Sequence, residues 1–341
     1  MSKICPVFIP FAGCANKCLY CDQSSLTGFS QSEIIHSTVS QIKAVTSSGS
    51  FNKIAFFGGS FTCLSAELRK TMYRISREYG FENIRVSTRP DCISKEIVDE
   101  LKINCITEVE LGIQTLNDKA LSENLRPYDA EKALKSLKMS CKNFYTVAQV
   151  MPGMYGDSTD EFLSGFENLL TLKPQGFRIY PTVVFKNTPL EKYYKDGKYT
   201  PLTLSEALQI SLYCTAACIN NGIEILRIGI PTENLDYSDI AAGPFHPAFG
   251  DLIRTLALML YFSKIGNNLI SSKDSSRAAG YKSLVKKLSL YKITDRKDIG
   301  RLNIHQVYKF IREQFIEDNF RLFQGQANHF AKILEYKAHY R

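Results

Sequence analysis

Three cysteines, Cys14, Cys18 and Cys21, stand within eight residues in a CxxxCxxC pattern. Three thiolates at this spacing can wrap one inorganic cluster. A structural zinc ion usually takes four ligands, and no second CxxC or pair of histidines lies nearby to supply the fourth. A 4Fe–4S cluster normally takes four cysteines, so three leave one iron open to a small molecule. The spacing favours such a cluster over a zinc site or three unrelated core cysteines.

Further polar and glycine residues follow the apolar runs of the sequence. A glycine pair, Gly58-Gly59, ends the run 54–57 and exposes backbone carbonyls without a Cβ in the way. Arg89 can hold a carboxylate with two parallel hydrogen bonds, or it can pair with Asp91 as a structural bridge. The amide of Gln114 both donates and accepts, which suits paired hydroxyls of a ligand; alternatively it caps a loop.

Short apolar runs alternate with helical patterns through most of the chain. Such alternation predicts parallel strands joined by helical crossovers, with ligands bound at the C-terminal ends of the strands. The predicted fold is α/β, a partial (β/α)6 TIM-type barrel of parallel strands with a C-terminal, mostly helical extension. The predicted strands are 7–9, 54–57, 84–87, 108–112, 145–151 and 177–184, with 223–228 as a candidate seventh.

Three parts are expected along the chain: a barrel over 1–230, a loop and helix that close it over 231–265, and a basic helical segment over 266–341. The net charge of +8 is concentrated near the end. From Lys264 onward there are 16 Lys and Arg against 7 Asp and Glu, whereas the first 263 residues are nearly neutral. This excess could face nucleic acid, or it could be a solvated helical surface.

Neither a secretory signal nor an apolar stretch of roughly 18 residues occurs in the sequence, so we expect a cytoplasmic protein with no membrane partner. Thiols stay reduced in that compartment. Cys214 and Cys218, one helical turn apart, are expected to be buried small hydrophobes. Cys63 and Cys92 follow loops at the C-terminal ends of predicted strands. For both we favour a place in the packed core over a place in the ligand pocket. We assign no role to Cys5, Cys105 and Cys141.

Four further segments, in order, make the sequence similar to a known family. They are 56–62 (FFGGSFT), 87–91 (STRPD), 110–115 (ELGIQT) and 151–156 (MPGMYG). With the cysteine motif and the aromatic Tyr20 before its last cysteine, they resemble the radical SAM superfamily. The narrower resemblance is to its elongator-catalytic-subunit-like branch, near the oxygen-independent coproporphyrinogen oxidases.

The resemblance implies a 4Fe–4S cluster on the three motif cysteines and S-adenosyl-L-methionine bound to its open iron. One electron, from a reductase or a flavodoxin- or ferredoxin-type donor, would cleave the cofactor to a 5′-deoxyadenosyl radical that abstracts hydrogen from a substrate. The residues that the resemblance assigns to cofactor binding are Tyr20, Gly58, Gly59, Ser60, Thr62, Arg89, Gln114, Gly153 and Gly156.

The substrate is less constrained than the cofactors. Members of the elongator-like branch modify tRNA with the help of an acetyltransferase domain, and this chain has no acyl-CoA-binding glycine motif. A tRNA nucleoside, contacted through the basic C-terminal segment, is the favoured substrate. The alternatives are a tetrapyrrole or haem-related reaction, and a nucleic-acid-binding protein that keeps a cluster without turnover. His246, between two prolines, is either a catalytic proton carrier or a structural histidine.

Overall fold

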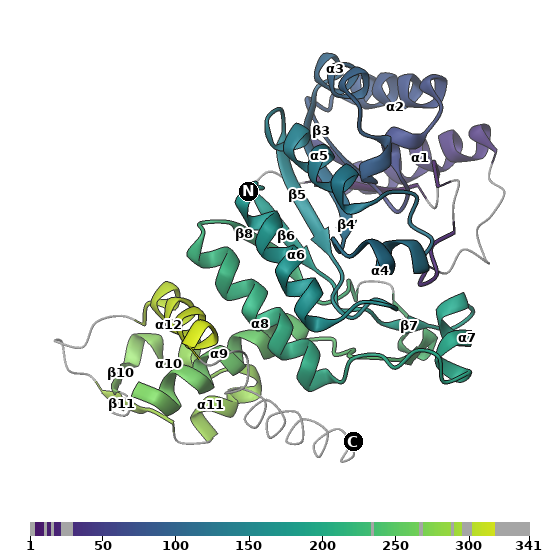
Figure 1. Ribbon diagram of the computed structural model, residues 1–341. Helices are drawn as coiled ribbons and strands as arrows, with labels where there is room; N and C mark the ends of the chain where they lie inside the picture. The colour runs from purple at the N-terminus through teal and green to yellow at the C-terminus, as the bar shows by residue number, and fades with distance from the viewer. Residues whose placement is uncertain are drawn as a thin grey trace.

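A half barrel of seven parallel strands forms the larger part of the computed structural model (Figure 1). The structure describes residues 4–9, 12–14, 17–21, 30–232, 235–265, 269–287, 290–294 and 302–317. The strand order is β1-β2-β3-β4-β5-β6-β8, which confirms the predicted partial barrel and its candidate seventh strand. The strands are β1 (Ile4–Phe8), β2 (Lys53–Phe57), β3 (Asn83–Thr88), β4 (Ile106–Gln114), β5 (Tyr145–Val150), β6 (Gly176–Ile179) and β8 (Glu224–Ile228).

Helices cover the outer face of this sheet, so side chains alternate between a helix-packed face and an inner face. In β1, Cys5 and Val7 are buried while Ile4 and Phe8 are exposed. The main barrel helices are α1 (Gln31–Thr46), α2 (Ala66–Glu78), α3 (Lys95–Ile103), α4 (Asp118–Glu123), α5 (Ala130–Cys141), α6 (Thr159–Thr171), α7 (Pro189–Lys195) and α8 (Leu204–Asn220).

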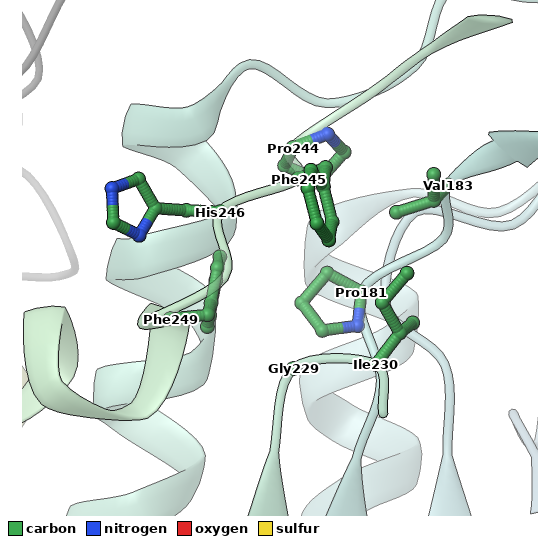
Figure 2. A pocket seen from close by; sticks show the side chains of 8 residues that line it. All are labelled: Pro181, Val183, Gly229, Ile230, Pro244, Phe245, His246 and Phe249. Carbon is green, nitrogen blue, oxygen red and sulfur yellow. The ribbon is translucent and has the colours of Figure 1, made fainter. Parts of the chain in front are cut away.

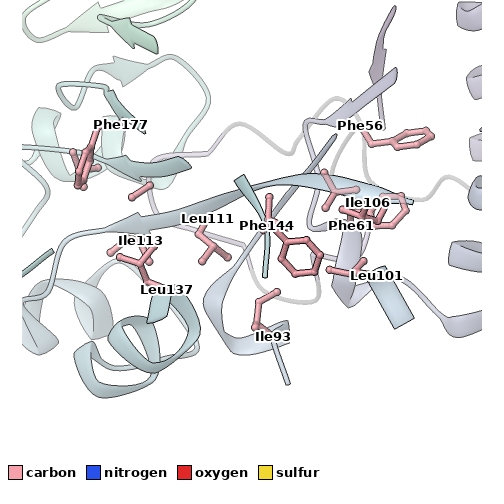
Figure 3. Packing of buried hydrophobic residues seen from close by; sticks show 14 of the residues in the cluster. Phe56, Phe61, Ile93, Leu101, Ile106, Leu111, Ile113, Leu137, Phe144 and Phe177 are labelled. Carbon is pink, nitrogen blue, oxygen red and sulfur yellow. The ribbon is translucent and has the colours of Figure 1, made fainter. Parts of the chain in front are cut away.

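Large apolar side chains fill the space between sheet and helices (Figure 3). Phe56, Leu111 and Phe177 come from three strands and have no exposed surface, and Phe61 packs on Phe56 with ring centroids 5.2 Å apart. Burying each such side chain contributes about 1.5–3 kcal/mol. This core fixes the strand ends from which the candidate site is built.

The sixth strand is shorter than predicted. It ends at Ile179, and Pro181, which has no N–H to donate to a ladder, follows two residues later. The chain resumes as β7 (Val184–Phe185), which pairs antiparallel with β9 (Ile240–Ala242). This short ribbon carries the loop of His246 to the C-terminal end of the sheet.

The extension after the barrel is mostly helical, as predicted. After β8 come α9 (Phe249–Ile265), which lies in the part predicted to close the barrel, and then α10 (Ser275–Ala278), α11 (Leu284–Lys287), α12 (Ile304–Glu317) and the parallel pair β10 (Leu269–Ser271) and β11 (Lys292–Thr294). Helix α8 joins the two parts, since Ile210 packs in the barrel core and Leu212 in the C-terminal core. The boundaries at 230 and 265 stay predictions, and 318–341 lie outside the described residues. In the described part of the chain, no helix combines the length and apolarity needed to cross a membrane.

Candidate active site

The cysteine motif follows β1 and lies directly on the glycine-rich loop that follows β2. The backbone N–H of Ser60 donates to the carbonyl of Ala12 at 2.8 Å. A Cβ on Gly59 would come within 2.4 Å of that same carbonyl, and one on Gly13 within 2.3 Å of the carbonyl of Ser60. Two glycines therefore allow the two loops to touch, and no motif in the sequence points to Gly13.

Backbone contacts with two other elements hold the second half of the motif. The N–H of Leu19 donates to the carbonyl of Asn124 at 3.3 Å, and the N–H of Leu190 donates to the carbonyl of Leu19 at 2.9 Å. The Leu19 side chain is buried against Val184. The positions of Cys18 and Tyr20 thus follow from the packing of the residue between them.

None of the three motif cysteines is in a disulfide. The Cys14 thiol lies 3.5 Å from the Ser60 hydroxyl, so two predicted site residues are in contact. Three thiolates on one zinc ion would lie within about 4.6 Å of one another. Among the described residues, the one trio of ligand atoms within 4.8 Å is Cys63, Asp91 and Cys92, so the motif sulfurs do not have this spacing. A cluster, which binds each cysteine to a different iron, fits the motif better.

Arg126, for which the sequence carries no motif signal, lies against the cysteine motif. Its Nη1 donates to the Cys18 sulfur at 3.2 Å and to the Tyr20 hydroxyl at 3.3 Å. Its Nη2 donates to the Gly112 carbonyl at 2.9 Å and to the Tyr128 hydroxyl at 2.7 Å. These contacts link the cysteine loop to the end of β4.

The guanidinium of Arg126 is buried and charged. Burial by itself lowers the pKa of Arg126, but its contacts with Tyr128, Tyr20 and Cys18 raise that pKa above the ordinary value. Burial also raises the pKa of Tyr128 to about 12, so this hydroxyl stays neutral. No carboxylate in the described ranges forms an ion pair with Arg126. A buried cation without a carboxylate is expected to face an anion of another kind.

A C-terminal cap of helix α4 places Arg126. The N–H of Arg126 donates to the carbonyl of Leu121 at 2.9 Å, and the N–H of Leu125 donates to the carbonyl of Ser122 at 3.0 Å. This is the Schellman pattern, which needs a left-handed residue, and Leu125 supplies it with φ of 58°. A leucine gives no sequence signal for such a cap, because glycine is the usual residue there.

Arg89 pairs with Asp91, which is one of the two roles predicted for it. It holds Asp91 with two bonds of 3.0 and 2.9 Å. Burial lowers the pKa of Arg89, but the bonds to Asp91 raise it above its ordinary value, and the charge of Cys14 adds to this rise. Its third nitrogen, Nη1, is buried and has no hydrogen-bond partner among the described residues. That orphaned donor leaves Arg89 available to an additional acceptor, so its contact with the cofactor carboxylate stays a prediction.

Thr62 is buried in the turn after β2, and Gln114 is buried at the end of β4. The Thr62 and Thr88 hydroxyls lie 2.6 Å apart and tie the glycine-rich loop to β3. Gln114 adopts a positive φ of 68°, and its Oε1 accepts from Nε2 of Gln149 at 3.3 Å. Gly58, with φ of 88°, lies under the ring of Phe8. The contacts of Gly58 and Gln114 with the cofactor stay predictions.

Gly153 and Gly156 have positive φ and pack closely against protein groups. A Cβ on Gly153 would meet Leu202 at 2.6 Å, and one on Gly156 would meet the Glu123 carboxylate at 1.9 Å. The positive φ of both glycines explains them without a cofactor, since the atoms that a Cβ would meet are the ends of side chains that can move. Their predicted contact with adenine stays a prediction.

His246 lies beside a small pocket but does not point into it. Figure 2 shows its ring directed away from Pro181 and Ile230. Its Nδ1 accepts from the N–H of Ala248 at 3.0 Å, and Tyr281 packs edge-on at 5.4 Å between ring centroids. Burial lowers the pKa of His246, and the charge of Lys282 lowers it further. These contacts fit the structural alternative, and the proton-carrier role stays a prediction.

Two of the seven cysteines outside the motif form a disulfide, and the other five are free. The expectation of packed, reduced thiols is wrong for Cys63 and Cys92, which form a disulfide. The turns after β2 and β3 bring them together, a proximity that their spacing of 29 residues does not reveal. Cys214 and Cys218 are fully buried, as predicted, and burial raises their pKa values. The described free cysteines outside the motif also include Cys5, which is buried, Cys105, which is exposed, and Cys141.

Comparison with known families agrees with this geometry. The profile of the radical SAM superfamily matches residues 8–167, and that of the Radical SAM C-terminal domain matches residues 174–257. The chain therefore belongs to the radical SAM superfamily, whose enzymes use a 4Fe–4S cluster and S-adenosyl-L-methionine.

Individual relatives match parts of the chain. An uncharacterised protein of Methanocaldococcus jannaschii is 33% identical over 47% of this chain and 51% of its own length. The tRNA uridine(34) acetyltransferase of the same organism is 33% identical over 38% of this chain and 24% of its length. The solved structure of Methanocaldococcus infernus Elp3 with an N-terminal deletion has a TM-score of 0.58 and 19% identity, covering 74% of this chain and 62% of that chain. This chain thus spans about half or less of the curated relatives' length.

Proposed function

We propose that this chain is a radical SAM enzyme in which Cys14, Cys18 and Cys21 hold three irons of a 4Fe–4S cluster. When bound and reduced, such a cluster would supply one electron for the cleavage of S-adenosylmethionine to methionine and a 5′-deoxyadenosyl radical, and this radical would abstract hydrogen from the substrate. The observation that carries this proposal is a pair of buried guanidinium groups, Arg89 and Arg126, at the motif. Asp91 is their one carboxylate partner among the described residues. Thiolate ligands and a cofactor carboxylate would supply the missing negative charge.

The residues of the chain would orient the cofactor and exclude water. Carbonyls of Gly58 and Gly59, with Ser60 and Thr62, would accept from its amino group. The orphaned Nη1 of Arg89 would donate to its carboxylate. The amide of Gln114 would bond its ribose, and the loop of Gly153 and Gly156 would lie along its adenine. Tyr20, Leu19 and Tyr128 would shield the motif from solvent.

Anaerobic reconstitution tests the cluster. The wild-type chain should bind about four irons and four sulfides. Cys14→Ser should lose most of this iron, whereas Cys105→Ser, which removes an exposed thiol outside the motif, should retain it. Equal iron content in both variants would contradict the assignment.

As substrate we propose a nucleoside in tRNA. Two observations support this class: the tRNA acetyltransferase relative, and exposed lysines in the C-terminal extension. Lys273, Lys286 and Lys287 are exposed, and no ion pair involving them occurs within the described residues. Phosphates would bind such side chains with an affinity that falls steeply with salt. Binding of tRNA that does not change with salt would count against this step. The electron would come from a reductase or a flavodoxin- or ferredoxin-type protein.

A further inference from the structure

We propose that Arg126 sets the reduction potential of the cluster, through its hydrogen bond to the Cys18 sulfur and its buried charge. This inference rests on the proposed function, because it requires a cluster on Cys18. Arg126 would be a positioning residue that acts through a ligand sulfur, and it would make the cluster easier to reduce.

The hydrogen bond gives the first argument. Nη1 of Arg126 lies 3.2 Å from the Cys18 sulfur, within the range for a bond to sulfur. Adding an electron to a cluster increases the negative charge on its sulfurs. A donor to one of these sulfurs therefore stabilises the reduced form more than the oxidised form, and the potential rises.

The charge balance around the guanidinium acts on the potential in the same direction. Arg126 is 9% exposed, and its side-chain neighbours besides Cys18 are the hydroxyls of Tyr20 and Tyr128, which are neutral. No carboxylate in the described ranges forms an ion pair with this guanidinium. In a buried setting the field of an unpaired cation is weakly attenuated, so it also favours the more negative cluster.

The rigidity of the contact gives the third argument. The backbone of Arg126 is fixed by the helix cap at Leu121. Its Nε and Nη2 both donate to the Tyr128 hydroxyl, at 2.9 and 2.7 Å, and that hydroxyl donates to the carbonyl of Gly112 at 2.7 Å. These bonds fix the guanidinium so that its Nη1 points at the Cys18 sulfur.

A redox titration followed by EPR tests this inference on the reconstituted full chain. At the wild-type midpoint, where half of the cluster is reduced, Arg126→Met should lower the ratio of reduced to oxidised cluster about tenfold. For a one-electron couple this equals a fall of about 59 mV. Arg126→Lys keeps the charge but not the planar guanidinium. Its ratio of reduced to oxidised cluster should lie between those of wild type and Arg126→Met. Arg69→Met is the control, since Arg69 is also buried but pairs with Glu100.

Iron content, measured first, separates the two proposals. A wild-type chain without iron would refute the proposed function. A wild-type chain with a cluster whose potential is the same in Arg126→Met would overturn this inference and leave the function standing. Should Arg126→Met lose iron, Arg126→Gln, which keeps an N–H donor without the charge, takes its place. A smaller fall than the tenfold one is expected for it, because the donor remains and only the charge is lost, and an unchanged ratio in both Arg126→Gln and Arg126→Lys would equally overturn the role.

Discussion

Gly13 and Gly59 bring the cysteine loop and the glycine-rich loop into direct contact. Each would place a Cβ within 2.4 Å of a backbone carbonyl, which cannot move without moving its loop. The sequence identified Gly59 through its motif. It did not reveal Gly13 or Arg126, because their roles depend on the meeting of segments that are far apart in the chain. Cys18 and Arg126, for example, are 108 residues apart.

The contact at Gly59 leads to a first prediction. Gly59→Ala should lower the free energy of unfolding by about 1–3 kcal/mol, because the added methyl meets the carbonyls of Ala12 and Ile9. Urea unfolding measures this loss. The control is Gly250→Ala, in helix α9, where the nearest atom would be an ordinary 3.6 Å away. That variant should be neutral or gain up to about 1 kcal/mol, and equal losses in both would contradict the packing account.

His246 leads to a second prediction, on pH dependence. Its pKa is lowered in the folded state by burial and by Lys282, so folding favours the neutral ring. The stability that this neutral ring contributes is fully present above the unfolded pKa of about 6.5 and is lost as the pH falls below it.

Unfolding measured from pH 7.5 to pH 5 tests this behaviour of His246. The wild-type stability should fall more steeply than that of His246→Asn, whose side-chain oxygen can still accept from Ala248. The slopes of stability against pH of the two proteins should differ by a fraction of about 1.4 kcal/mol per pH unit, which is the value for the uptake of one whole proton. Parallel stability curves would show that the pKa of His246 is the same in the folded and unfolded states, which would contradict this prediction.

The disulfide between Cys63 and Cys92 joins two turns at the ends of β2 and β3. Thr62 and Arg89, both candidate cofactor residues, lie in or beside these turns. In the denatured chain the bond would close a loop of about 30 residues. A loop of that length gives a stabilisation of about 3–4 kcal/mol in the chain-entropy account.

A third prediction follows for these two turns. The double variant Cys63→Ser/Cys92→Ser should be less stable than wild type by about 3 kcal/mol without reductant, and equally stable when the wild type is reduced. Denaturant unfolding with and without a thiol reductant measures both values. Cys105→Ser should match wild type in each condition. A double variant as stable as the unreduced wild type would show that the bond does not form in solution.

The strands and helices of the barrel could be predicted from the sequence because each has its own pattern of apolar residues. All six predicted strands and the candidate seventh occur, and capping motifs such as Ser30 with Glu33 mark helix starts. The strand predicted over 177–184 was too long, because its apolar residues continue past Pro181 while its hydrogen-bonded ladder does not. The pairing of β7 with β9 could not be predicted, since each has three residues or fewer.

The whole molecule combines a nearly neutral barrel with a basic helical extension. Helix α8 packs in both cores, so removing the extension would expose apolar surface. For this reason the proposed tRNA contact is better tested by changing charges than by truncation.

A fourth prediction concerns this surface. The triple variant Lys273→Glu/Lys286→Glu/Lys287→Glu should bind tRNA more weakly and with a smaller salt slope, by about one for each lost phosphate contact. Filter binding or fluorescence anisotropy over a salt series measures both. The matched control reverses three exposed lysines of helices α2 and α3, Lys70, Lys95 and Lys102. Equal losses in the two triple variants would assign the effect to net charge, against a contact through the extension.

Formation of 5′-deoxyadenosine tests the central claim most directly. The reconstituted full chain is incubated without oxygen with S-adenosylmethionine and dithionite, and the nucleoside is quantified by chromatography. The wild-type chain should produce it only when the reductant is present, and Cys18→Ser should reduce its formation at least a hundredfold. A wild-type chain that holds its cluster but forms no 5′-deoxyadenosine, or a Cys18→Ser variant that forms as much as wild type, would contradict the account.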